Sequence, residues 1–222
     1  MKSVHGLWQA RVQRGVVMPM VMGLLMLAAI MTPAYATAPA PRTVLVLGDS
    51  LSAGYGLSAT QGWVPLTAAR MKTTHPDWRV VNASISGETT AGGASRIAAE
   101  LKRVKPAVVV IELGANDGLR GLSLQQTRTN LDAMIRAALQ SKAKVLLVGM
   151  RLPPNFGPDY TREFEANYSA LSKQYKTALL PFLLAPVASD RRNFQADNMH
   201  PVAAAQPKLR DHVWTALAPL LK

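Results

Sequence analysis

Hydrophobic positions along the chain gather into five short runs separated by longer amphipathic segments. The runs are mostly continuous rather than alternating, and they lie at residues 43–47, 80–85, 107–113, 144–149 and 178–184. Continuous runs of this length are typical of strands that are buried on both faces, as in a parallel sheet. Five such strands alternating with helices predict an α/β fold, a three-layer α/β/α sandwich around one parallel sheet.

Three segments between or after these runs show helical periodicity. Ser123 is placed to cap a helix that runs to Gln140, in a Ser-x-x-Gln box with Gln126, and Pro201 is predicted to start the last helix. The inward faces are Leu131, Met134, Ile135, Ala138 and Leu139, then Tyr160, Phe164, Tyr168, Leu171 and Tyr175, then Leu209, Val213, Ala216, Leu217 and Leu220. Helical spacing alone explains the aromatic stripe, so we interpret it as core rather than as a binding platform.

The first 36 residues have the pattern of a secretory signal peptide. Three basic residues and no acidic residue precede an apolar run at residues 16–31, and Ala34-Tyr35-Ala36 forms a small-x-small cleavage site. We expect cleavage after residue 36, so that residues 37–222 form one domain of a periplasmic or secreted protein. An uncleaved anchor is the alternative, although the apolar run is short against the roughly 20 residues that span a bilayer.

The chain is basic, with 25 Lys and Arg, 13 Asp and Glu and a net charge of +12. Three of the basic residues and none of the acidic ones lie in the first 36, which leaves +9 on the remaining domain. Basic residues are scattered, with local clusters only at 102–105 and 191–192, so no nucleic-acid partner is predicted. A solvated basic surface and a weak attraction to an anionic membrane surface both remain open.

Serine is the obvious candidate for covalent catalysis, because the chain contains no cysteine for a thiolate nucleophile, a disulfide or a thiolate metal site. In "VLGDSLSAGYG", Ser50 lies just past the first apolar run, where reactive groups sit in parallel sheets. A turn in which Asp49 and Ser50 merely cap backbone donors is the alternative. The stretch lacks the lysine of a phosphate-binding loop and the second glycine of a lipase Gly-x-Ser-x-Gly elbow.

Three further stretches fall at the matching ends of other predicted elements, namely "ASISGETT", "LGANDG" and "DNMHP". A serine hydroxyl needs a base to take its proton, and a neutral imidazole needs an acceptor on its other nitrogen. His200 is the best-placed histidine, and Asp197 lies three residues before it, so one turn can aim both toward Ser50. A helix cap or a surface pair is the alternative for these two residues.

Acyl transfer also needs hydrogen-bond donors for the oxyanion. The backbone amide of Gly87 and the side-chain amide of Asn116 are placed to join the amide of Ser50, although both stretches also read as tight turns. We assign Asp49 to holding the nucleophile loop. Glu112, inside the third apolar run, is either a buried structural acceptor or a tuned site carboxylate, and we favour the structural role.

Four blocks in this order, "GDSLSAGYG", "NASISGETT", "ELGANDGLRG" and "DNMHP", closely resemble the SGNH (GDSL) hydrolase family. The resemblance covers essentially all of residues 37–222. It implies a flavodoxin-like fold with Ser50 as nucleophile, His200 as general base and acid, and Asp197 as orienting carboxylate. It also implies Ser50, Gly87 and Asn116 as oxyanion donors, with no metal or cofactor.

The resemblance further implies hydrolysis of acyl esters, thioesters and lysophospholipids, including arylesterase activity. Leu119 and Leu122, with Leu152 and Phe156 opposite, are candidate substrate-binding residues for an acyl chain, and ordinary packing is the alternative for each. A carbohydrate O-acetyl esterase and a non-catalytic lipid- or polyanion-binding protein remain as alternative functions. Nothing in the sequence demands an oligomer, so we expect a monomer.

Overall fold

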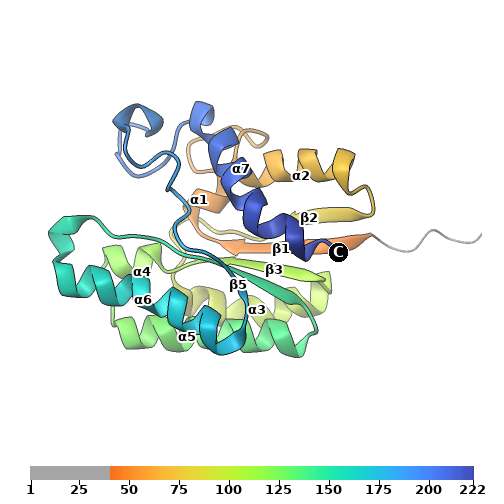
Figure 1. Ribbon diagram of the computed structural model, residues 1–222, viewed down its shortest axis with the longest axis horizontal. Coiled ribbons are helices and arrows are strands. Elements are labelled where there is room, and N and C mark those ends of the chain that lie inside the picture. Colours follow the sequence, from red (N-terminus) through yellow and green to blue (C-terminus); the bar gives the residue numbers. More distant parts are fainter. Residues whose placement is uncertain (1–40) are drawn as a thin grey trace, which may run out of the picture. The chain divides into compact units, whose positions relative to one another are not determined.

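The computed structural model of the protein describes residues 41–222 as a sheet between two layers of helices (Figure 1). The strands are β1 (Arg42–Gly48), β2 (Trp78–Asn82), β3 (Val108–Glu112), β4 (Lys144–Val148) and β5 (Ala178–Leu180). Neighbouring strands are all parallel, in the order β2-β1-β3-β4-β5, which is the order of a flavodoxin-like sheet. The predicted fold class is therefore confirmed. The predicted signal peptide, residues 1–36, lies outside the described residues.

Two of the predicted strands end three or four residues before their apolar runs do. The strand expected at 80–85 is β2, an edge strand whose pairing with β1 stops at Asn82, and Ile85 lies in the following loop with half of its surface exposed. The strand expected at 178–184 stops at Leu180, because Pro181 follows and has no N–H to continue the ladder. Both loops therefore begin at the carboxyl edge of the sheet.

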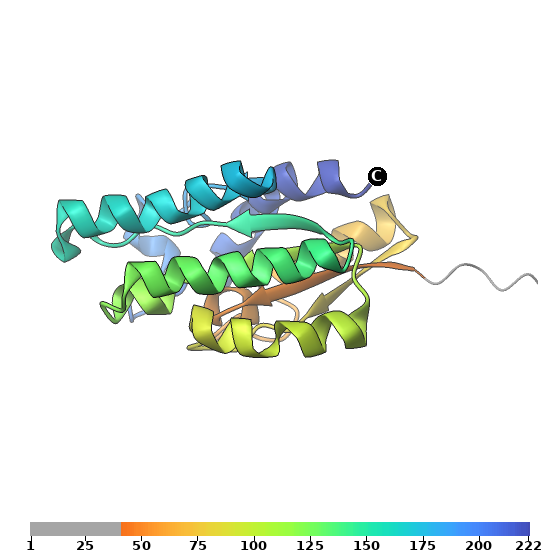
Figure 2. The same cartoon turned by 90° about the horizontal axis from the view of Figure 1, so that it is seen from below.

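The two faces of the sheet carry different helices, as Figures 1 and 2 show. One face is covered by α2 (Trp63–Thr74) and α7 (Gln206–Leu217), and the other by α3 (Thr90–Val104), α5 (Leu124–Gln140) and α6 (Pro158–Tyr175). The short helices α1 (Ser50–Ala53) and α4 (Ala115–Leu119) follow directly after β1 and β3. Single 3₁₀ turns are η1 (Pro154–Phe156), η2 (Arg191–Asn193), η3 (Ala203–Ala205) and η4 (Ala218–Leu220).

The predicted cap of α5 is present, but only half of the predicted box forms. The Ser123 hydroxyl accepts a hydrogen bond from the backbone N–H of Gln126 at 3.3 Å. The Gln126 side chain donates to Asn130 instead of returning to the cap. The cap therefore satisfies one free helix donor rather than two.

The last helix begins at Gln206, five residues after the predicted start at Pro201. Pro201 instead forms a bridge with Phe194, and its carbonyl accepts a hydrogen bond from the Gln206 side chain at 3.2 Å. A different proline, Pro207, occupies the first turn of the helix. Prolines are favoured in the first turn of a helix. The preference is met here by Pro207, whereas the sequence analysis had assigned this place to Pro201.

The aromatic stripe of α6 belongs to the core, as predicted. Phe164 and Tyr168 are almost fully buried with ring centroids 5.5 Å apart, and the Tyr168 hydroxyl donates to the Leu113 carbonyl at 3.0 Å. This bond ties α6 to the carboxyl end of β3. None of the helices between residues 41 and 222 is both long and apolar enough to cross a membrane.

Candidate active site

The turn after β1 places Ser50 at the carboxyl edge of the sheet, as the first residue of α1. Asp49 caps this helix by accepting a hydrogen bond from the Leu51 N–H at 3.0 Å. Only glycine fits at position 48, because a Cβ there would lie 2.7 Å from the Ser52 side chain and 2.8 Å from a Glu112 carboxyl oxygen. The chain therefore passes from strand to helix in one residue, and the Ser50 hydroxyl lies at the edge of the sheet.

Ser50, His200 and Asp197 form a continuous chain of hydrogen bonds. The Ser50 Oγ lies 2.8 Å from His200 Nε2, and His200 Nδ1 lies 2.7 Å from Asp197 Oδ2. The other carboxylate oxygen of Asp197 accepts from the backbone N–H groups of Met199 and His200. These backbone bonds and the imidazole lower the pKa of Asp197 to about 2, so it is ionised at neutral pH.

The loop that carries His200 is tied to the nucleophile loop. Gln195 donates its backbone N–H to the His200 carbonyl at 2.8 Å and its side-chain amide to the Tyr55 carbonyl at 2.9 Å. The Tyr55 ring packs against the imidazole, with the two ring centroids 4.6 Å apart. The sequence analysis missed Tyr55. Its place two residues after the end of α1, in the nucleophile loop, was the signal for it.

The three expected oxyanion donors differ in availability. Within residues 41–222, the backbone N–H groups of Ser50 and Gly87 have no hydrogen-bond acceptor. The side-chain amide of Asn116 donates one hydrogen bond to the Asp49 carboxylate at 3.1 Å and one to the Glu88 carbonyl at 3.0 Å. Two free backbone donors therefore lie at the carboxyl edge of the sheet, together with a third donor that already makes two hydrogen bonds.

Two buried carboxyl groups lie beneath the nucleophile turn. Glu112 is fully buried, accepts from the Ser52 hydroxyl at 2.6 Å and leaves its second oxygen without a partner. Burial, and then the charge of Asp49, raise the pKa of Glu112 well above its usual value. Burial also raises the pKa of Asp49, to about 6. Burial therefore favours the protonated, neutral form of Glu112, which agrees with a structural role.

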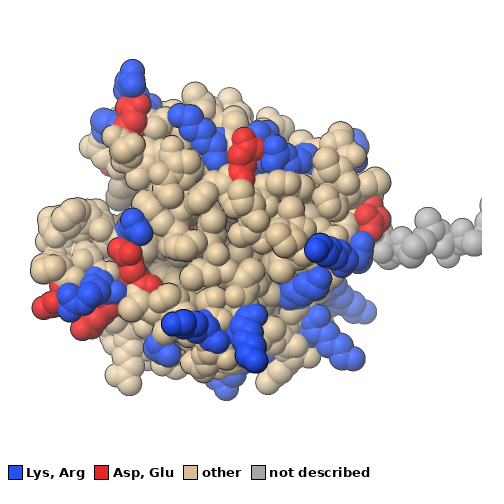
Figure 3. All heavy atoms as spheres, viewed as in Figure 1, with Lys and Arg blue, Asp and Glu red and all other residues tan. Residues whose placement is uncertain are grey.

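A cavity of about 230 Å³ opens beside the Ser50–His200 pair. Figure 3 shows the surface hollowed on the same side of the molecule, between two lobes. The cavity is lined mainly by apolar side chains, which include Leu119, Met150, Leu184, Phe194 and Met199. Its lining suits an acyl chain better than a sugar or a charged group.

Three of the four predicted substrate-binding residues lie outside the lining of this cavity. Leu122 is exposed on the loop after α4, and its carbonyl accepts a hydrogen bond from Tyr160. Leu152 is 8% exposed and packs where a side chain on Gly118 would lie. Phe156 stacks on Tyr160 with centroids 6.4 Å apart. Of these four predicted residues, only Leu119 lines the cavity. The sequence analysis missed the lining residues that follow β4 and β5 and those beside His200. The loops at the carboxyl ends of the strands were nevertheless the expected place for such residues.

Groups that would hold a metal ion are absent from the part of the chain that the structure describes. Its histidine and acidic side chains form no cluster of three or more. The other two histidines in this part of the chain lie elsewhere, since His75 ends α2 and His212, on α7, bonds the Phe182 carbonyl.

Comparison with known proteins points to one family. Residues 46–206 match the model of the GDSL-like lipase/acylhydrolase family. The chain is 52% identical over 182 residues to "Esterase TesA" of Pseudomonas aeruginosa, a match that covers 82% of this chain and 90% of the relative. It is 41% identical over 184 residues to "Thioesterase 1/protease 1/lysophospholipase L1" of Escherichia coli K12, covering 83% and 87%.

Solved structures agree with the sequence comparison. A crystal structure of TesA superimposes with a TM-score of 0.78 at 52% identity, covering 81% of this chain and 99% of that one. The psychrotrophic esterase EstA from Pseudoalteromonas also gives 0.78, at 38% identity, with coverage of 81% and 98%. The family match spans all four sequence blocks and most of the described sheet, so the chain belongs to the GDSL-like lipase/acylhydrolase family.

Proposed function

We propose that the protein hydrolyses acyl esters and thioesters through an acyl-enzyme intermediate on Ser50. The observation that carries this proposal is the unbroken chain from the Ser50 hydroxyl through His200 to Asp197, at 2.8 and 2.7 Å, beside an apolar cavity. The names of the relatives, esterase and thioesterase/lysophospholipase, agree with this reaction type.

In the first half-reaction, the Ser50 Oγ attacks the carbonyl carbon while its proton passes to His200 Nε2. Asp197, an anion at neutral pH, holds the Nδ1–H of the imidazole and stabilises the imidazolium that forms. The tetrahedral oxyanion accepts hydrogen bonds from the Ser50 and Gly87 backbone amides and the Asn116 side chain. His200 then gives its proton to the departing alcohol or thiol.

In the second half-reaction, water attacks the acyl-serine ester. His200 takes the proton of this water, the same donors hold the second oxyanion, and the proton returns to the Ser50 oxygen as the carboxylic acid leaves. The chain's own residues thus supply every proton acceptor and donor that the cycle needs.

The apolar lining of the cavity supports one class of substrate. We infer medium- to long-chain acyl groups, such as those of lysophospholipids and other membrane-derived esters, because the lining is mainly apolar. Leu119→Asp is expected to lower activity on octanoyl esters at least about tenfold while sparing acetyl esters, since it places a charge in the path of the chain. Leu122→Asp is the matched control, because Leu122 is similarly exposed and lies outside the cavity lining.

The setting of the enzyme is a separate proposal. We infer that it is exported as a monomer and acts on small-molecule substrates in the periplasm or outside the cell, on the strength of the signal-peptide pattern in residues 1–36. The charge of +9 on the remaining domain supports a weak attraction to anionic membrane surfaces. Cell fractionation, light scattering and sedimentation with anionic vesicles test these three points.

The deciding experiment is hydrolysis of nitrophenyl esters, from acetyl through octanoyl to palmitoyl, by the mature chain. We expect activity with a medium- to long-chain optimum that disappears in Ser50→Ala and survives in Ser58→Ala, an exposed serine of the next loop. An acetyl optimum would favour carbohydrate deacetylation. Turnover that is independent of Ser50 would overturn the proposed mechanism, and no turnover at all would leave lipid or polyanion binding.

A further inference from the structure

The excess positive charge of the domain is concentrated at one end of the molecule, which we call the basic pole. It consists of the start of β1, the last turn of each long helix, and the loop and strand start that follow each turn, at residues 42–43, 71–79, 101–109, 137–145, 172–179 and 214–222. It contains 11 of the 22 Lys and Arg residues that follow residue 36, but only one of the 13 acidic residues, Asp77. Figure 3 shows blue side chains gathered around the end where β1 begins, whereas red side chains lie mostly at the other end. The remainder of the domain, with 11 basic and 12 acidic residues, is nearly neutral.

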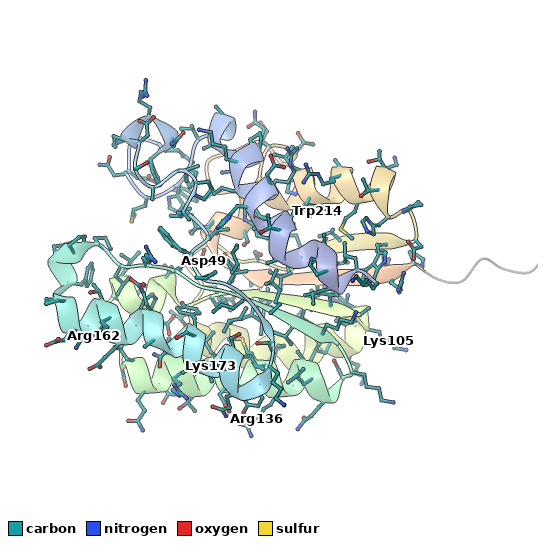
Figure 4. The ribbon with its side chains drawn as sticks, viewed as in Figure 1. Asp49, Lys105, Arg136, Arg162, Lys173 and Trp214 are labelled. Carbon is teal, nitrogen blue, oxygen red and sulfur yellow. The ribbon has the colours of Figure 1, made fainter. Side chains whose placement is uncertain are left out.

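This concentration is a product of the topology rather than of a run in the sequence. In a parallel sheet, every connecting helix returns the chain to the amino edge, so the ends of the helices and the starts of the strands meet there. Figure 4 places Lys105 at this edge, at the opposite end of the sheet from Asp49, the neighbour of Ser50. Basic residues that are scattered along the sequence therefore share one surface, which lies away from the cavity beside Ser50.

The charges of the basic pole are exposed and mostly unneutralised. All 11 of its basic residues are exposed. Arg42 pairs with Asp77 at 2.6 Å, and Arg103 pairs with Glu100 one turn earlier on α3. The other nine form no ion pair within residues 41–222, although the C-terminal carboxylate adds one negative charge to the same end. A positive potential therefore faces the solvent at this pole.

Three of these lysines occupy backbone positions that suit glycine better. Lys105, Lys142 and Lys176 follow α3, α5 and α6 with φ angles of 48°, 66° and 52°, and Asn198 is the only other non-glycine residue with positive φ in the described chain. Glycine adopts this conformation after a helix without strain. A cation near a helix end also stabilises the helix, but the last turns of α3 and α6 already carry basic residues for that purpose. Lysine at these three positions thus adds surface charge at a cost in backbone strain.

Apolar side chains lie among the charges. A cavity of about 360 Å³ at this pole is lined by Lys142, Lys144 and Lys176 together with Leu139 and Leu220. Leu139 is 37% exposed. Ammonium groups around exposed apolar side chains match the interface of a bilayer, where anionic headgroups meet hydrocarbon. No aromatic side chain lines this cavity, so a nucleic acid would find no platform for its bases there.

We propose that the basic pole docks the protein onto an anionic phospholipid surface and leaves the active-site cavity, at the other edge of the sheet, open to water. This inference rests on the membrane attraction proposed above and assigns it to one face. Each basic residue that approaches an anionic bilayer strengthens binding about fivefold, so a cluster of this size binds where a dispersed charge would not.

The sharpest test replaces the three strained lysines together, as Lys105→Asn, Lys142→Asn and Lys176→Asn. Asparagine tolerates the left-handed conformation, so this variant should unfold in urea at or above the parent's midpoint. The assay is co-sedimentation of the mature chain with vesicles of phosphatidylglycerol and phosphatidylcholine in about 0.1 M salt. We expect the apparent dissociation constant to rise at least about tenfold, with no binding of the parent to vesicles of phosphatidylcholine alone.

A second triple variant is the matched control for net charge. Arg128→Gln, Arg162→Gln and Lys208→Gln also remove three positive charges, from α5, α6 and α7, at positions outside the basic pole. Its apparent dissociation constant should change less than about threefold, because charges beyond a Debye length of the lipid are screened. Equal losses in the two triple variants would overturn the assignment to one face.

Hydrolysis of nitrophenyl acetate by the vesicle-bound protein provides an independent readout. The rate should match that of the free protein, since the cavity beside Ser50 faces away from the lipid. Loss of hydrolysis on binding would overturn the proposed orientation. Failure of the parent to bind anionic vesicles, or retention of a DNA duplex in its place, would overturn the docking itself, whereas Ser50-dependent hydrolysis in the same preparation would leave the proposed reaction intact.

Discussion

Replacing Glu112 with glutamine should make the protein more resistant to unfolding than the parent, and increasingly so as the pH rises above 5. Glu112 is fully buried, and its pKa lies well above the usual 4.5, first because of burial and then because of the Asp49 charge. Above pH 4.5 the unfolded chain releases this proton while the folded chain keeps it. The parent then loses about 1.4 kcal/mol of stability per pH unit until the folded pKa is reached.

The magnitude follows from this slope. For each pH unit between 4.5 and the folded pKa, the free energy of unfolding of the parent falls by about 1.4 kcal/mol through Glu112, and Glu112→Gln avoids this loss. Glutamine keeps the shape and an oxygen for the Ser52 hydroxyl, which now donates at 2.6 Å. Glu112→Ala lacks both and should be destabilised at every pH, because a buried hydroxyl loses its acceptor and a void remains.

The assay is urea unfolding of the parent and both variants at half-unit steps from pH 4.5 to 7.5. The quantity of interest is the difference between Glu112→Gln and the parent, which cancels the titration of all other groups to first order. A difference that rises with pH supports a neutral buried acid. A difference that stays flat across this range would refute the reasoning, because Glu112 would then titrate in the folded protein as it does in the unfolded chain.

Three further outcomes are expected. Tyr55→Ala should lower kcat about tenfold and Tyr55→Phe at most about twofold, because the ring packs on the His200 imidazole and holds it in place; equal losses would assign the effect to the hydroxyl. Gly149→Ala should lower the free energy of unfolding, measured with urea, by about 2 kcal/mol, because the added Cβ would lie 2.4 Å from a backbone oxygen. In the control Gly62→Ala, the added Cβ has no contact closer than 3.6 Å, and the loss should be less than about 1 kcal/mol. N-terminal sequencing of the exported protein should begin directly after Ala36, and an intact N-terminus would indicate an anchor instead.

The fold was predictable from the sequence because buried parallel strands leave a strong local signal. The run from Val108 to Glu112 is continuous and apolar except for its last residue, and all five of its side chains are buried. Reactive groups of parallel sheets gather at the carboxyl ends of the strands. This generalisation predicted that Ser50 and His200 lie together, although 150 residues separate them. Their catalytic roles, and those of the oxyanion donors, remain proposals.

Other parts of the site depend on contacts that no local pattern reveals. Pro201 pairs with Phe194 in a bridge, and its carbonyl accepts a hydrogen bond from the Gln206 side chain, so α7 does not start at this proline as the sequence predicted. Leu152 follows β4 as expected, yet it packs into the core above Gly118 rather than into the cavity. Which side of a loop faces a cavity depends on neighbours far along the chain, and periodicity carries no information about them.

The tie between the first and last parts of the chain also sets the order in which the enzyme gains its activity. Gln195 reaches back to Tyr55, and His200 reaches back to Ser50, so the catalytic pair is complete only after the C-terminal loop has docked. Under the proposed mechanism, a growing chain carries its nucleophile early but has no base for it. Hydrolysis then begins only when the last loop folds, and ester groups that the chain meets during its synthesis are left intact.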